Sequence, residues 1–145
     1  MSFQFPLAAV LRFRESIEQR EYLALERVQQ DIVRVEVRIR QAQDELSVAI
    51  QKRVGELALG TRAAAMQSAY QHEKAMEQEI EQLRSLWQEL KMKWRQQLAT
   101  YEQARRNRES LEKLREKQLN VYDQDKAKRE QAIVDDLFLA RRRRR

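Results

Sequence analysis

The sequence predicts an all-α protein, an antiparallel two-helix coiled-coil hairpin whose second helix is longer than the first and overhangs it. Three observations predict this fold. Only two of the 145 residues are Gly and one is Pro, so turns have little to form from. Strong helix formers dominate the chain, and 36% of its residues are charged. Apolar residues recur every 3.5 residues on both sides of the two glycines, as in a coiled coil.

The first helix is expected over about residues 6–54. Its apolar residues alternate strictly in steps of three and four, which places them along one seam. They are Leu25, Val28, Ile32, Val35, Ile39, Ala42, Leu46 and Ala49. Upstream, the stripe continues more loosely through Leu7, Leu11, Ile17 and Tyr22.

The connection between the helices is expected at about residues 55–60. Both glycines, Gly55 and Gly60, lie in the stretch VGELALGTR. Gly is disfavoured in a helix interior by roughly 1 kcal/mol relative to Ala, and helices often end at one. Thr61 is expected to cap the second helix, because its hydroxyl can accept a hydrogen bond from an early backbone N–H.

The second helix is expected over about residues 61–140, followed by a basic tail at 141–145, within a single domain of residues 1–145. Its seam is interrupted only by Glu73 and consists of Met66, Ala69, Met76, Ile80, Leu83, Trp87, Leu90 and Trp94. Folding the chain about the middle of the glycine stretch pairs residues whose numbers sum to about 115, which sets Leu25 against Leu90. Phe3 then lies near Glu112, and the rest of the second helix overhangs. The alternative is one continuous helix that dimerises.

The residues that carry chemistry in enzymes form no recognisable pattern. There is no Cys, and the single histidine, His72, begins a fragment like the zinc-protease helix motif. Met76 stands where that motif needs its second histidine. Asp123 and Asp125 lack the Gly and the Glu that complete a calcium loop. We therefore expect no catalytic residue, no cofactor and no metal.

The opening stretch MSFQFPLAAVLRFRESIEQRE is apolar and then basic. A signal peptide has the opposite order, and a spanning helix needs about 20 apolar residues, so neither export nor membrane insertion is expected. The net charge is +6, and residues 141–145 carry five of these charges, which leaves 6 − 5 = +1 for the rest. A nearly balanced body argues against specific binding of nucleic acid.

Two other functions remain open from the residues alone. A basic coiled coil could bind nucleic acid through the terminal arginines and a basic run that Glu109, Glu112 and Glu116 interrupt. The run consists of Arg105, Arg106, Arg108, Lys113, Arg115 and Lys117. A chaperone-like hairpin could instead grip unfolded proteins between its helices.

Both ends of the chain resemble a known family. The opening pattern of Phe3, Phe5, Leu7, Val10, Leu11, Arg14 and Glu18 is similar to that of FliJ proteins, the soluble stalk proteins of the bacterial flagellar export apparatus. Arg129 and Glu130, followed by Asp135 and Asp136, resemble the charged carboxy-terminal segment of the same family. The stalk proteins of virulence-associated type III secretion are the nearest alternative.

The resemblance implies a non-enzymatic central stalk, similar in architecture to the gamma subunit of rotary ATP synthases. Such a protein binds and stimulates the export ATPase ring and couples it to the export gate and to export chaperones. It is expected in the cytoplasm, peripheral at the cytoplasmic face of the inner membrane.

Two sets of residues follow from this interpretation. The expected ATPase-binding set is Phe3, Phe5, Leu7, Leu11, Arg14, Leu114, Leu119, Tyr122, Ile133, Leu137 and Phe138. The expected export-gate set is Ser68, His72, Ala75 and Glu79.

Overall fold

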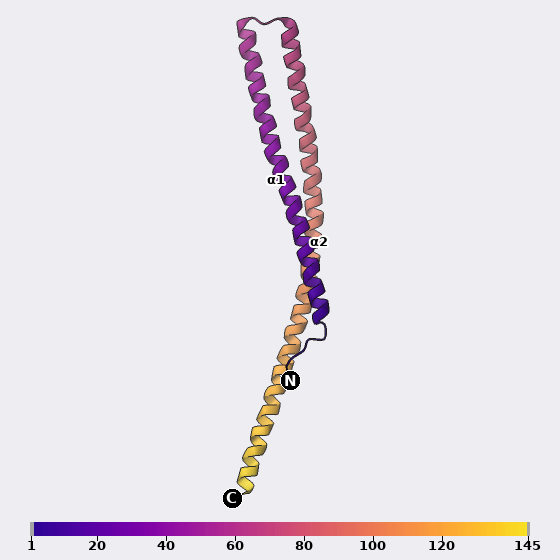
Figure 1. The fold of residues 1–145 in the computed structure, drawn as a ribbon, viewed down its shortest axis with the longest axis vertical. Coiled ribbons are helices and arrows are strands. Elements are labelled where there is room, and N and C mark those ends of the chain that lie inside the picture. Colours follow the sequence, from indigo (N-terminus) through magenta and orange to yellow (C-terminus); the bar gives the residue numbers. More distant parts are fainter. Residues whose placement is uncertain (1, 145) are drawn as a thin grey trace. The chain divides into compact units, whose positions relative to one another are not determined.

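The computed structural model describes residues 2–144. Over these residues it consists of two helices, α1 (Ala8–Leu59) and α2 (Ala63–Arg143), with no strand (Figure 1). The helices pack against each other as an antiparallel pair joined by a short connection. The prediction of an all-α helical hairpin is confirmed.

The chain divides into two compact units, and each is described by itself. The hairpin unit is Tyr22–Thr100, and the terminal unit combines Met1–Glu21 with Tyr101–Arg145. The expectation of a single domain over residues 1–145 stays a prediction.

The core of the hairpin unit comes from the two seams. Val28, Ile32 and Ala42 of α1 are buried, as is Ile80 of α2, and Ile32 is only 1% exposed. Trp87 and Trp94 are half-buried. The 3.5-residue period therefore selects the side chains that the two helices remove from water.

The connection is shorter and later than expected. Helix α1 continues through Gly55 to Leu59, so only residues 60–62 join the helices. Gly60 has a φ of 82°, in the left-handed region that favours Gly at a helix end. Gly55 lies inside α1, since a helix tolerates one Gly at a cost of about 1 kcal/mol. The prediction of a loop over 55–60 is wrong.

The predicted role of Thr61 is also wrong. Its hydroxyl donates to the carbonyl oxygen of Glu56 at 2.5 Å, and thus caps the end of α1 rather than the start of α2. The backbone N–H of Gly60 donates to the Leu57 carbonyl at 3.2 Å in the same turn. These two bonds satisfy carbonyls that the end of a helix leaves without partners.

The register of the hairpin unit differs from the prediction by one heptad. Among the hydrogen bonds between its helices are those that join Glu36 with Trp87, Arg38 with Glu79, and Arg53 with Glu73. The residue numbers in each pair sum to between 117 and 126, around 122 rather than 115. The predicted pairing of Leu25 with Leu90 is wrong because the turn is centred at residue 61. The same seams still face each other, because a shift of seven residues preserves the heptad.

The terminal unit packs the opening residues onto α2. Residues 2–5 are not helical, and a turn at Pro6 and Leu7 leads into α1, with the Ala8 N–H donating to the Phe5 carbonyl at 3.1 Å. Phe5, Leu11 and Ala104 are buried. The rings of Phe3 and Tyr122 lie 5.6 Å apart between centroids, at 52°.

The expected position of Phe3 near Glu112 is therefore wrong. An extended residue advances more than 3 Å along the chain, against 1.5 Å in a helix, so the opening segment reaches further along α2 than a helix would. Beyond Tyr122, all of residues 123–144 are exposed. Figure 1 shows this last part of α2, in yellow, continuing past the opening segment.

Candidate docking surfaces

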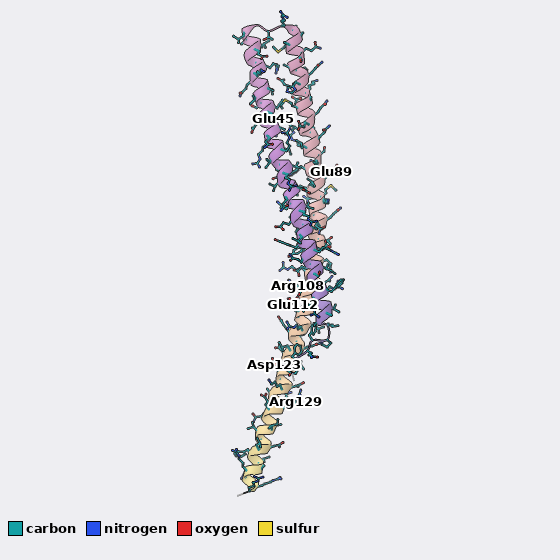
Figure 2. All side chains as sticks on the ribbon, in the orientation of Figure 1. Glu45, Glu89, Arg108, Glu112, Asp123 and Arg129 are labelled. Atoms are coloured by element: carbon teal, nitrogen blue, oxygen red, sulfur yellow. The ribbon has the colours of Figure 1, made fainter. Side chains whose placement is uncertain are left out.

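Arg108 joins the two helices of the terminal unit. Its Nε and Nη2 both donate to the Glu18 carboxylate, with Nη2 at 3.2 Å from Oε1, and its Nη1 donates to Glu112 at 2.6 Å. Figure 2 labels Arg108 and Glu112 close together along α2. The bond to Glu18 raises the pKa of Arg108, against the opposing effect of desolvation. A raised pKa keeps the Arg108 guanidinium charged throughout the neutral pH range, so the contribution of that positive charge is lost only in strong alkali.

The opening half of the expected ATPase-binding set lies against α2. Phe5 and Leu11 are buried, and Phe3 and Arg14 are half-buried. Leu7 is exposed at the edge of this packing. A partner would reach Phe5 and Leu11 only by unpacking the terminal unit.

The α2 half of the set divides in the same way. Leu119 and Tyr122 are half-buried, and Leu114 is exposed. Ile133, Leu137 and Phe138 are well exposed, Phe138 at 66%. Only these last three lie in the part of α2 where every described side chain is exposed.

Two exposed apolar residues were missed in the sequence. Val134 and Leu139 have exposures similar to those of Ile133 and Leu137. Val134 follows the spacing i, i+1, i+4, i+5 and so lies on one helix face with Ile133, Leu137 and Phe138. We call these four residues the distal stripe. The spacing alone could have identified Val134.

The expected export-gate residues lie on one face of α2 in the hairpin unit. Ser68, His72, Ala75 and Glu79 are spaced by four, three and four residues, which brings them to the same side of the helix. The first three are exposed. Glu79 accepts from Arg38 Nη2 at 2.5 Å, and this bond, followed by one from Arg38 to Glu45, raises the pKa of Arg38.

Two open grooves between the helices border this face. One, of about 580 Å³, is lined by His72, Met76 and Glu79 together with Val48 and other residues of α1. The other, of about 380 Å³, lies nearer the connection and is lined by Ser68 and His72. Ala75 lines neither groove.

A third groove, of about 540 Å³, surrounds Trp87. Ile39, Arg40, Arg84 and other residues of the two helices line it. The indole Nε1 of Trp87 donates to Glu36 Oε1 at 3.0 Å, and Lys91 Nζ lies 5.2 Å from the ring centroid. These contacts hold the ring at both its polar edge and its face. Trp87 therefore acts as a large side chain that fills the core and forms part of the groove wall.

Glu73, the polar break in the α2 seam, is paired across the hairpin unit. Its side chain is 7% exposed and accepts from Arg53 Nε at 2.7 Å. A buried carboxylate needs such a partner, because an unpaired buried charge is costly. The sequence showed the break but not its partner, since the predicted register placed Arg53 elsewhere.

Two arginines of the basic run named in the sequence analysis are already paired with carboxylates of the same chain. Arg105 donates to Glu109 at 2.9 Å, and Arg108 is held by Glu18 and Glu112. These contacts reduce the positive charge that the run offers to phosphates, which weakens the nucleic-acid alternative. In the terminal arginine run, Arg145 lies outside the described residues.

Between residues 2 and 144, no group of three or more His, Cys, Asp or Glu side chains is arranged to hold a metal ion. None of the helices in this same range is long and apolar enough to cross a membrane.

Comparison with protein families gives one match that spans nearly the whole chain. The family model described as FliJ, flagellar FliJ protein, matches residues 3–145. The matched range includes both the opening segment and the exposed part of α2. Comparisons with curated proteins and with solved structures give no match.

Proposed function

The chain belongs to the flagellar FliJ protein family and is thus a component of the flagellar export apparatus, and from this premise we propose that it is the non-enzymatic central stalk of that apparatus. In this role it binds and stimulates the export ATPase ring, and couples the ring to the export gate and to export chaperones. It works in the cytoplasm, at the cytoplasmic face of the inner membrane.

The observation that carries this proposal is the exposed part of α2, residues 123–144. An isolated helix gains little stability from its own propensity and normally packs an apolar face against something. The distal stripe offers four large apolar side chains, and each gains roughly 1.5–3 kcal/mol when it is buried. A partner that covers this stripe is therefore favoured, and we assign the ATPase contact to it.

The opening residues have a different part in this proposal. Phe3, Phe5 and Leu11 pack against α2, so they position the docking helix rather than enter the ring. Arg14 is half-buried. Leu7 is the member of the opening group that remains accessible to the ATPase.

The export-gate contact is assigned to the face formed by Ser68, His72, Ala75 and Glu79. The grooves of about 580 and 380 Å³ beside this face provide concave surface for a partner side chain. This face belongs to the hairpin unit and the distal stripe to the terminal unit, so the two contacts use separate surfaces.

The test is stimulation of ATP hydrolysis by the flagellar export ATPase of the same organism. A chain without residues 123–145 should lose stimulation, while the contact of Phe3 with Tyr122 is kept and circular dichroism still shows a high helix content. A triple variant, Ile133→Ser, Leu137→Ser and Phe138→Ser, should lose most of the stimulation as well.

The matched control changes three exposed apolar residues of the hairpin unit, Val33→Ser, Val54→Ser and Met92→Ser. This control should stimulate like the unchanged chain. If the shortened chain stimulates the ATPase as well as the full chain does, residues 123–144 are not the docking end and the proposal fails.

A further inference from the structure

The end of the hairpin unit at the connection carries the most exposed large apolar side chain among residues 2–144. This side chain is Leu59, the last residue of α1, which is 89% exposed, and Leu57 and Val54 before it are also exposed. Three exposed alanines, residues 63–65, begin α2. We call residues 54–65 the tip. Figure 1 shows the tip at the top, where the chain turns from α1 into α2.

Charges are sparse around the tip, and most of them are positive. Four of the 27 residues 46–72 are charged, against 36% of the whole chain. Three are basic, Lys52, Arg53 and Arg62, and one is acidic, Glu56, which gives 3 − 1 = +2. Lys52 and Arg62 are exposed, whereas Glu56 is half-buried. The tip therefore combines accessible apolar side chains with accessible positive charge.

The backbone where α1 ends is hydrogen-bonded within the tip. The Thr61 hydroxyl donates to the Glu56 carbonyl, and the Gly60 N–H donates to the Leu57 carbonyl. A carbonyl without a partner resists removal from water, because an unsatisfied backbone group costs free energy in apolar surroundings. These two bonds therefore lower the cost of moving the tip out of water.

The apolar side chains of the tip point to different sides of α1. Leu57 and Leu59 are two residues apart, which separates them by about 200° around the helix. A groove along one side of α1 would cover one of them and leave the other in water, whereas a surface that the tip meets end-on covers both. Residues 54 to 59 rise by about 7.5 Å along the helix. This length matches the depth of about 5–10 Å to which apolar groups enter the surface of a bilayer.

The size of the tip favours a lipid surface over a protein partner. Ten of residues 54–65 are exposed, whereas a stable protein interface uses about 20–30 residues on each side. A second copy of the chain that met this one tip to tip would therefore bury too little surface. A lipid surface has no such requirement, because it closes around each apolar side chain that enters it.

We infer that the tip is a lipid-binding site, which inserts Leu57 and Leu59 into the surface of an anionic bilayer. Lys52 and Arg62 then lie at the level of the phosphate groups, since basic side chains are attracted to the negative surface potential of such a bilayer. The insertion is shallow and reversible, because only a few apolar side chains enter. This contact goes beyond the proposed function and does not depend on the ATPase contact.

The test follows the tip itself, because the arginine run at the end of α2 also attracts anionic lipid. The chain contains no Cys, so Ala58→Cys provides a single site in the tip for the fluorophore NBD. The labelled full chain is titrated with phosphatidylcholine vesicles that contain phosphatidylglycerol. NBD emission should shift to shorter wavelength and be quenched by nitroxide-labelled lipid. The same label at Gln30→Cys, an exposed position of α1 outside the tip, should stay in water.

Two variants of the labelled chain test the side chains that carry the contact. Leu57→Ser combined with Leu59→Ser should raise the lipid concentration for half of the NBD shift by at least about tenfold, because two large apolar side chains no longer leave water. Arg62→Gln should raise it by about fivefold, through the loss of one positive charge at the surface.

The matched controls make the same kinds of change at exposed positions outside the tip. They are Val33→Ser combined with Val37→Ser, and Arg27→Gln. Both should leave the titration nearly unchanged, and circular dichroism checks that every variant stays helical. Losses as large as those of the tip variants would mean that the response is not specific to the tip, and would overturn the inference.

Three further outcomes would also overturn the inference. The first is a label at residue 58 that stays in water at every lipid concentration. The second is an equally strong shift with pure phosphatidylcholine, since the positive charge would then have no role. The third is self-association in sedimentation equilibrium that Leu57→Ser with Leu59→Ser abolishes, which would assign the tip to a second copy. The ATPase is absent from all of these measurements, so the proposed function is tested separately.

Discussion

Glu73 and Arg53 form an ion pair whose two members differ in their access to water. The Glu73 side chain is 7% exposed, whereas that of Arg53 is 27% exposed. Arginine can turn its charged end toward solvent along its long side chain, but a carboxylate enclosed in the seam cannot. Removing Arg53 and removing Glu73 should therefore lower the free energy of unfolding by different amounts.

Substitution of the two partners should give unequal losses of stability. Arg53→Met leaves a buried carboxylate unpaired and should lower the free energy of unfolding by about 3 kcal/mol. Glu73→Met removes the buried charge and should cost less than about 1 kcal/mol, since Arg53 reaches water. Urea titration followed by circular dichroism measures both. Equal losses would mean that the carboxylate is not isolated from solvent.

Ile32 and its neighbour Val33 give a second comparison at this scale. Ile32 is 1% exposed in the hairpin unit, while Val33 is exposed. Ile32→Ala should lower the free energy of unfolding by about 2–5 kcal/mol through lost burial and the cavity that it leaves. Val33→Ala should change it by less than about 0.5 kcal/mol. Thermal unfolding of both variants measures the difference, and a small effect of Ile32→Ala would contradict the assigned core.

The candidate site was predictable residue by residue only in part. Ile133, Leu137 and Phe138 are accessible apolar residues, as the sequence suggested. Phe5 and Leu11 belong to the same predicted set but are buried against α2. An apolar residue near a partner site and an apolar residue in a core look alike in a sequence, because both patterns arise from the same side chains. Only the packing distinguishes them.

At the scale of the elements, the connection shows that two possible ends of α1, one at Gly55 and one at Gly60, differ little in free energy. Gly55 and Gly60 are both able to end a helix, and each costs only about 1 kcal/mol inside one. Packing of the seams around residues 53 and 73 outweighs that cost and extends α1 to Leu59. The presence of helix α1 was therefore predictable from the apolar period. The position of its last residue was not, because it depended on contacts across the hairpin unit.

The two glycines should respond to alanine with opposite signs. Neither has a heavy atom within 4 Å of an added Cβ, so only the backbone conformation differs. Gly55→Ala should raise the free energy of unfolding by about 0.5–1 kcal/mol, because Gly55 lies inside α1. Gly60→Ala should lower it by about 1–2 kcal/mol, because its φ is 82°. Urea titration decides, and a stabilising Gly60→Ala would contradict the turn.

At the scale of the whole molecule, the fold class and the family were predictable because both depend on features distributed along the chain. The heptad stripes, the single Pro near the start of the sequence and the position of the glycines predict an antiparallel hairpin, and the described helices confirm it. The resemblance to the FliJ family is confirmed by the match over residues 3–145. The register was not predictable, because heptad repeats are satisfied equally at every shift of seven residues.

The protein should be monomeric in solution. The seams of α1 and α2 pack against each other, so no second chain is needed to cover them. A continuous helix would expose both seams and would dimerise. Sedimentation equilibrium should give a mass near 17.5 kDa. An obligate dimer of twice this mass would favour the continuous helix.

The heptad seam that allowed the register to be misplaced also bears on how such a chain can evolve. Inserting seven residues in α1 and seven at the facing position of α2 returns every seam residue to the same side. Gene duplications or deletions that change both helices by matched heptads would therefore alter the reach of the hairpin by about 10 Å while preserving its core. Single-residue insertions would rotate the seam toward solvent and be removed by selection. Related hairpins should accordingly vary in length by sevens.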